Sequence, residues 1–234
     1  MALRLVAVSF DVRDAGGVAA FWADLLGREI VPEPSGALVP GNDTQVGLRF
    51  VVADTEEGAG PNRLHLHLTS SDLEDQSHTV EKVVELGGRL IRQHPEEGHV
   101  VMADPGRNEF CVIEPENGFL AGCGFLAEVT CEGPPNVGRF WSEALGWPLV
   151  WDRGQQTAIQ SPLGGTKVSW DVRPGSPKYG SKRQRFDLIA SDLASELPRL
   201  VALGATQLGD NDGVVAMSEP GDYEFTVSTA EAGA

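Results

Sequence analysis

The amino-acid sequence predicts an α+β fold made of four βαβββ units. Four apolar stripes with helical spacing each end in a Leu-Gly pair, at Gly27, Gly87, Gly146 and Gly204. These glycines lie 60, 59 and 58 residues apart, a regularity that marks structural repetition. One strand-like segment precedes each stripe and about three short extended segments follow it.

The first helix is predicted in AGGVAAFWADLLGREI, residues 15–30. Val18, Phe21, Trp22 and Leu25 recur at the i, i+3, i+4, i+7 spacing of an amphipathic helix, and Gly27 is a helix stop. The same pattern predicts helices in segments 78–91, 135–150 and 192–208. Pro134 and Pro135 stand at the start of the helix predicted in 135–150, where prolines are tolerated.

A predicted strand precedes each helix, in segments 4–12, 63–70, 124–131 and 185–191. Extended segments follow the helices, at 46–54, 99–106, 109–115, 166–174, 214–221 and 223–228. Turn-forming residues collect at 54–62, 115–122 and 173–182, which we interpret as linkers.

A longer repeat relates the two halves of the chain. The pair Phe21-Trp22 recurs 119 residues later as Phe140-Trp141, and DPGRNEFCV at 104–112 matches EPGDYEFTV at 219–227. Units one and two therefore form one module and units three and four repeat it. We predict two domains, residues 1–117 and 118–234.

Composition excludes several classes of function. The net charge of -16 disfavours nucleic acid and anionic membranes and favours neutral or cationic small molecules. No apolar run approaches the length of a membrane span, and Asp11 and Arg13 interrupt any signal-peptide core. The odd number of cysteines argues against a disulfide framework. We therefore expect a cytoplasmic protein, as a monomer or a homodimer.

The repeated unit and the DPGRNEF turn before a last strand resemble the vicinal oxygen chelate superfamily of glyoxalase, bleomycin-resistance and extradiol dioxygenase proteins. Further matching segments are VRDAGGVAAFWADLLG, RLHLHLTSSDL, FWSEALG, RFDLIASDL and EPGDYEFTV, so the resemblance covers nearly the whole chain. It implies that each pair of units forms a glyoxalase-like module, a curled mixed sheet whose concave face is a cup. The family hosts both enzymes and binding proteins, so the resemblance implies no single function.

The resemblance also implies positions for metal ligands, on the first, fifth and last strands of a module. In the first module these positions fall on Ala7, His65 and Cys111, and in the second on Leu126, Arg185 and Thr226. Only His65 is an ordinary metal ligand of the family, and the second set suits no divalent cation. We expect the second module to bind no metal.

Strand alternation predicts which side chains line the first cup. In LHLHL, residues 64–68, His65 and His67 share one face. The same cup is predicted to hold Glu109, Cys111 and Asp11. One interpretation is a divalent metal site (Zn, Fe, Mn or Ni) built on His65, His67 and Glu109. The favoured interpretation is a hydrogen-bonded polar pocket with no cofactor.

The second cup has its own predicted lining. Four ionisable groups occupy positions analogous to the first cup, and Trp170 is placed to stack on a flat ligand; the set is Glu128, Trp170, Arg185, Asp187 and Glu224. Burying such a group of charges without a ligand or mutual pairing is costly, which favours a polar pocket.

The favoured function is the binding or sequestration of a neutral or cationic organic ligand by a glyoxalase/bleomycin-resistance-like protein without a metal. One alternative is a metal-dependent lyase or dioxygenase centred on His65. Another is a metal-free enzyme of specialised metabolism that uses His65, His67 or Glu109 to move protons.

Overall fold

The computed structural model describes residues 3–54, 62–93, 96, 98–172 and 183–229. The first unit comprises β1 (Leu3–Val12), α1 (Ala15–Leu26), β2 (Val31–Glu33), β3 (Gly36–Val39) and β4 (Gly47–Val52). The second comprises β5 (Leu64–Leu68), α2 (Leu73–Glu85), β6 (Arg89–Gln93), β7 (Val100–Ala103) and β8 (Glu109–Val112).

The second half repeats this order. The third unit comprises β9 (Leu126–Glu132), α3 (Pro135–Leu145), β10 (Leu149–Arg153), β11 (Gln156–Gln160) and β12 (Lys167–Asp171). The fourth comprises β13 (Gln184–Ala190), α4 (Leu193–Ala202), β14 (Thr206–Asn211), β15 (Val214–Ser218) and β16 (Glu224–Ser228). The predicted α+β fold of four βαβββ units is confirmed. Of the predicted linkers, 173–182 and nearly all of 54–62 lie outside the described residues.

The helix ends follow the sequence signals. Gly27 and Gly146 are the C-caps of α1 and α3 in the left-handed conformation, which glycine adopts without a steric penalty. Gly87 and Gly204 also have positive φ and stand one residue after the C-caps of α2 and α4. The predicted Leu-Gly stops are therefore confirmed.

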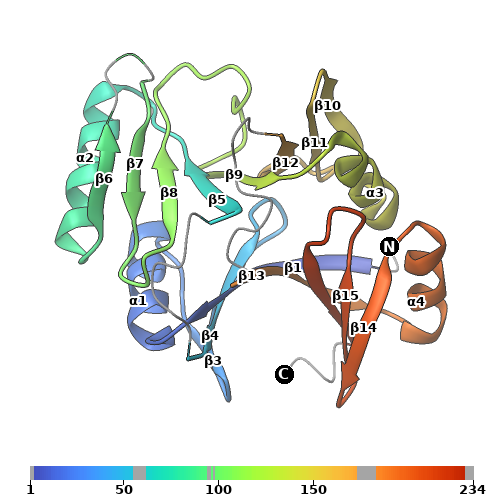
Figure 1. Cartoon of the computed structure of the whole chain (residues 1–234). Coiled ribbons are helices and arrows are strands. Elements are labelled where there is room, and N and C mark those ends of the chain that lie inside the picture. Colours follow the sequence, from blue (N-terminus) through green and yellow to red (C-terminus); the bar gives the residue numbers. More distant parts are fainter. Residues whose placement is uncertain (1–2, 55–61, 94–95, 97, 173–182, 230–234) are drawn as a thin grey trace.

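The pairing of the units differs from the expectation. Units one and four build one eight-stranded sheet, in the order β14-β15-β16-β13-β1-β4-β3-β2 (Figure 1). Units two and three build the other, in the order β10-β11-β12-β9-β5-β8-β7-β6. At the centres, β1 pairs antiparallel with β13, and β5 with β9. The prediction that each consecutive pair of units forms one sheet is therefore wrong.

Aromatic packing joins consecutive units although they lie in different sheets. On α1, Trp22 lies with its ring centroid 4.9 Å from that of Phe110, on β8 of the second unit. On α3, Trp141 makes the equivalent contact with Phe225 on β16, at 5.0 Å. These helices therefore join consecutive units through their buried faces, while β1 pairs with β13 and β5 pairs with β9.

Alternation along the central strands separates an apolar core from two polar faces. On β1, Val8 and Phe10 are buried in the core, while Ser9 and Asp11 point to the opposite side. We call the polar side of β1, β4, β13 and β16 the 1–4 cup. The polar side of β5, β8, β9 and β12 is the 2–3 cup.

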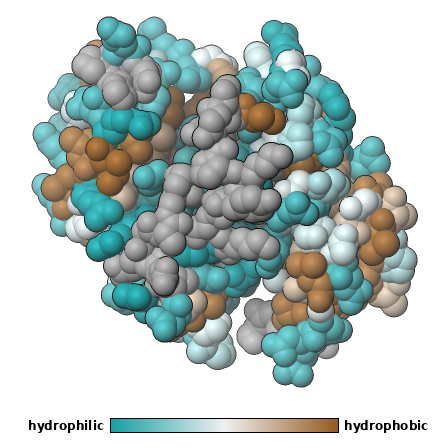
Figure 2. All heavy atoms as spheres, in the orientation of Figure 1, coloured by the Kyte–Doolittle hydropathy of each residue, from teal (hydrophilic) through white to brown (hydrophobic). Residues whose placement is uncertain are grey.

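The sheets are open, with β2, β14, β6 and β10 as edge strands. Every residue of β6 and of β14 is exposed. Figure 2 shows apolar atoms gathered over α2 and β6, where Val84, Leu90 and Ile91 are exposed. Val84 on α2 and Val201 on α4 continue the apolar spacing of their helices, but both side chains face solvent. Among the described residues, no helix is long and apolar enough to cross a membrane.

Candidate functional site

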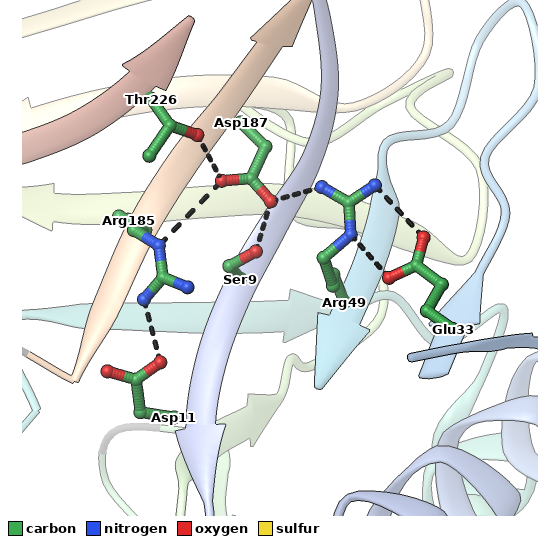
Figure 3. Close-up of polar contacts among 7 residues, drawn as sticks. All are labelled: Ser9, Asp11, Glu33, Arg49, Arg185, Asp187 and Thr226. Atoms are coloured by element: carbon green, nitrogen blue, oxygen red, sulfur yellow. Dashed lines mark hydrogen bonds and ion pairs between the residues drawn. The ribbon is translucent and has the colours of Figure 1, made fainter. Parts of the chain in front are cut away.

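Four polar side chains, one from each central strand, meet on the floor of the 1–4 cup (Figure 3). The Asp187 carboxylate on β13 accepts hydrogen bonds from the Ser9 hydroxyl on β1 and from the Arg49 guanidinium on β4. The Thr226 hydroxyl on β16 donates to the other carboxylate oxygen at 2.7 Å. Asp187 is therefore the centre of the network, and it is buried.

Ion pairs extend the network to both sides of the floor. Arg49 binds Glu33 through two hydrogen bonds, from Nε at 2.9 Å and from Nη2 at 3.2 Å. On the other side, Arg185 donates from Nη1 to Asp11 at 2.7 Å and places Nε 3.9 Å from Asp187. Acidic and basic groups thus alternate across the cup.

Burial and charge act against each other at Arg49. Desolvation opposes the charged form, but the neighbouring carboxylates of Asp187 and Glu33 outweigh it and raise the pKa of Arg49. The guanidinium therefore stays charged, with 18% of its side chain exposed. Asp187 keeps an ionic partner although it lies inside the protein.

Above this floor lies a pocket of about 310 Å³. Its polar lining comprises Glu33, Ser35, Arg49, Arg185, Asp187, Thr226 and Ser228, and its apolar lining Val6, Pro34, Val51, Leu188, Ile189 and Val214. This volume lies at the lower end of the range for small-molecule sites, about 300 to 1,000 Å³. A charged floor beside aliphatic walls suits a small amphipathic molecule.

The 2–3 cup holds a buried acid–base pair. Nδ1 of His67 on β5 lies 2.7 Å from the Glu128 carboxylate on β9, which also accepts from the Ser169 hydroxyl on β12. Desolvation would lower the pKa of His67, but hydrogen bonds to Cys111 and Glu128 and the charge of Glu128 raise it to about 9. Burial opposes the same pairing at Glu128, yet His67 holds the pKa of that carboxyl below its usual value. The pair is ionised at neutral pH.

The chain itself covers part of this cup. The connection between β8 and β9 packs Leu120 and Cys123 with Ile113 and Ala127, against Cys111 and Phe119. The Phe119 carbonyl accepts a hydrogen bond from Lys167 Nζ on β12, which also lies 4.5 Å from the centroid of the Phe119 ring. The predicted linker at 115–122 therefore lies against the polar side of the 2–3 sheet.

The structure divides the predicted site residues between the two cups. Arg185, Asp187 and Glu224 belong to strands of the 1–4 cup, and His65, His67, Glu109, Cys111 and Glu128 to strands of the 2–3 cup. His65 Nε2 lies 3.6 Å from Glu109. Asp11 was expected beside His65, but it lies in the 1–4 cup and binds Arg185, because β1 pairs with β13. That prediction is wrong.

The prediction that Trp170 lines a cup and stacks on a ligand is also wrong. Its side chain is only 2% exposed and belongs to the hydrophobic core, because it shares the inner face of β12 with Val168. It lines neither cup.

Several side chains of the two cups were not among the predicted site residues, and the charged ones are Arg49, Glu33 and Lys167. Arg49 was recognisable as the single charge in the apolar segment GLRFVV, since a lone arginine within a buried strand needs a partner. Glu33 and Lys167 gave no comparable signal. Their partners are set by tertiary contacts.

The cross-module pairing regroups the family's metal-ligand positions. Ala7, Arg185 and Thr226 share the 1–4 sheet, and His65, Cys111 and Leu126 share the 2–3 sheet. The first set contains no good ligand for a divalent cation, and the second contains one imidazole and one thiol. His67 already holds a proton and an acid partner. Within the described residues, no group of three or more His, Cys, Asp or Glu is placed to hold a metal ion. The residues present do not fit the metal site that the family resemblance implies.

Comparison with known proteins shows which protein family the chain belongs to. The family model for the glyoxalase-like domain matches residues 7–113 and again residues 127–228. The chain therefore belongs to the glyoxalase-like family and carries two copies of its domain. The division at residue 117 stays a prediction.

Solved structures support the same fold. Glyoxalase I from Zea mays superposes with a TM-score of 0.69 at 13% identity, covering 98% of this chain and 93% of the maize chain. A candidate dioxygenase from Bacillus subtilis subsp. subtilis str. 168 superposes with a TM-score of 0.59 at 16% identity, covering 96% and 84%. At these identities the likeness concerns the fold alone. No curated protein matches the sequence significantly.

The His67–Glu128 pair predicts how stability changes with pH. The folded-state pKa of His67 is about 9, above its ordinary value of 6.5. The pair therefore stabilises the fold fully below about pH 6.5, and this contribution is lost as the pH rises through 9. Between pH 7 and 10 we expect the free energy of unfolding to fall by an amount on the order of 3 kcal/mol. Urea unfolding at each pH measures it.

The variant His67→Gln separates the effect of His67 on stability from the effects of other titrating groups. Burial raises the pKa of the Glu219 carboxyl to about 7, so most of its destabilising effect accrues below pH 7 and little of it falls within that range. His67→Gln should flatten the pH dependence, whereas His78→Gln, at an exposed position on α2, should leave it unchanged. Equal slopes for the wild type and His67→Gln would refute the assignment.

Proposed function

We propose that this chain binds a small organic molecule in the 1–4 cup and does so without a metal. The observation that carries the proposal is the pocket of about 310 Å³, whose floor is the charged network centred on Asp187. Such a network is costly to bury inside a solid core, whereas it can orient a ligand at the base of a pocket.

Charge balance supports a neutral or cationic ligand. The pocket lining contains two acidic residues, Glu33 and Asp187, and two basic residues, Arg49 and Arg185. Asp11 adds a further negative charge behind Arg185. Because the whole chain carries a net charge of -16, its long-range field also disfavours anions.

Absence of a metal is part of the proposal. A divalent cation in the 1–4 cup would have to displace the guanidinium groups that already neutralise its carboxylates. In the 2–3 cup it would compete with the proton of His67.

The three cysteines are free thiols, which supports our placing the protein in a reducing cytoplasm.

Thermal-shift screening tests the proposal. A ligand that binds only the folded state raises its melting temperature, by an amount that follows its concentration over its Kd. We expect some neutral or cationic compounds to raise the melting temperature of the wild type. Val51→Trp should abolish these shifts, because Val51 lines the pocket and an indole would fill it.

Val150→Trp is the matched control. It makes the same substitution on the exposed edge strand β10 of the other sheet, and the shifts should persist. Shifts that survive Val51→Trp, or a screen in which no neutral or cationic compound acts, would contradict binding in the 1–4 cup.

A further inference from the structure

The repeat places equivalent side chains in the two cups. In the 1–4 cup, Ser9 on β1 pairs with Arg49 on β4. Glu128 on β9 stands 119 residues after Ser9, and it pairs with Lys167 on β12, which stands 118 residues after Arg49. Both strand pairs are parallel, and in both the paired side chains lie on the cup side of the sheet. Arg49 and Lys167 therefore hold the same place, each a cation on the floor of its cup.

In the 2–3 cup, the cation Lys167 binds a segment of the chain itself. Lys167 donates a hydrogen bond to the Phe119 carbonyl, and its Nζ lies 4.5 Å from the centroid of the Phe119 ring. Trp151 on β10 meets that ring edge to face, with centroids 5.6 Å apart. An aromatic ring and a carbonyl oxygen, both supplied by the connecting segment, thus occupy the position next to this cation.

Arg49 offers a similar surface in the 1–4 cup. Its edges are taken by Asp187 on one side and by Glu33 on the other, as Figure 3 shows. A guanidinium whose edges are bound by carboxylates can still stack an aromatic ring on its planar face. Among the described residues, no aromatic ring makes a cation–π contact with Arg49. Its side chain remains partly exposed and lines the pocket.

We infer that the ligand of the 1–4 cup carries an aromatic ring next to a carbonyl group, the chemistry with which Phe119 occupies the other cup. The ring lies on the Arg49 guanidinium, flanked by aliphatic side chains such as Val51 and Ile189. The carbonyl oxygen accepts a hydrogen bond from an arginine N–H that the carboxylates leave unused. This inference rests on the proposed function, since it names the class of molecule that the same pocket binds.

A matched pair of neutral probes tests it. N-acetyl-phenylalaninamide and N-acetyl-cyclohexylalaninamide share their amides and side-chain topology, and only the first has a π face. We expect the aromatic probe to bind about 5-fold more tightly in an NMR titration of the wild-type chain, because only it gains the cation–π contact. Val51→Trp should abolish binding of both, and Val150→Trp should leave the preference intact.

The outcomes separate the two proposals. Equal affinities, or tighter binding of the cyclohexyl probe, would overturn the aromatic inference and leave the proposed function standing. If neither probe binds while other neutral compounds raise the melting temperature, the aromatic inference is likewise overturned and the proposed function still stands. If neither the probes nor the wider set of compounds bind, the proposed function fails as well. Binding that Val51→Trp does not affect would overturn the assignment to the 1–4 cup.

Discussion

Asp187→Ala is expected to destabilise the protein by about 3 to 5 kcal/mol, the usual cost of removing one partner from a buried ion pair. The carboxylate bonds to three side chains, those of Ser9, Arg49 and Thr226. Without it, the fully buried Ser9 hydroxyl loses its acceptor, and Arg49 keeps only Glu33 as an ionic partner. Urea unfolding at neutral pH measures the loss.

A surface pair is the control for this substitution. Asp152 binds Arg139 at 2.9 Å, but both side chains are substantially exposed. Asp152→Ala should cost about 1 kcal/mol or less. If the two substitutions cost the same, Asp187 does not organise a buried network on the floor of the 1–4 cup.

Trp22→Ala is expected to have an effect of similar or larger size. Truncation of a buried tryptophan costs about 3 to 5 kcal/mol. Trp22 packs on Phe110 and so joins the first unit to the second. It also donates from Nε1 to the buried Asp104 at 2.9 Å, and burial already raises the pKa of that carboxyl. Loss of the donor adds to the loss of packing.

The repeat supplies a test that separates these two contributions. Trp141 holds the equivalent place on α3, but its buried Nε1 has no hydrogen-bond partner among the described residues. Trp22→Phe should therefore cost about 1 to 3 kcal/mol more than Trp141→Phe, since only the first deprives a buried carboxylate of a donor. Equal costs for the two phenylalanine variants would remove Asp104 from the explanation.

Much of the fold was predictable because it depends on local signals. Helical spacing and the Leu-Gly stops identified the four helices, and alternation assigned the two faces of strands such as LHLHL. The pairing of sheets was not predictable in this way. The apolar inner faces of β1 and β5 show the same pattern whichever strand lies beside them, so the sequence leaves the choice of β13 and β9 open.

The same reason explains which parts of the site were predicted correctly. Asp187 and Arg185 were expected to project from a polar face, and they do. Asp11 was assigned to the wrong cup because its partner Arg185 comes from the other module. Trp170 was assigned to a ligand although the inner face of β12 buries it. The Asp11 error therefore concerns a contact between strands, whereas the Trp170 error concerns the face of a single strand.

The two histidines of LHLHL are also clearer in the structure. His67 pairs with Glu128 from the second module, and His65 lies near Glu109 from its own. The resemblance had placed His65 at a ligand position whose companions are Ala7 and Cys111. Ala7 belongs to the other sheet, so the three ligand positions that the resemblance implies for the first module do not lie on one sheet.

Binding of a small neutral or cationic molecule between β1, β4, β13 and β16 can be located by amide NMR. The wild-type chain is titrated with compounds that raise its melting temperature. We expect the largest shift changes at Arg49, Val51, Asp187 and Thr226, which line the pocket. Shift changes confined to the 2–3 cup, around His67 and Glu128, or spread over the surface without reaching the pocket, would contradict it.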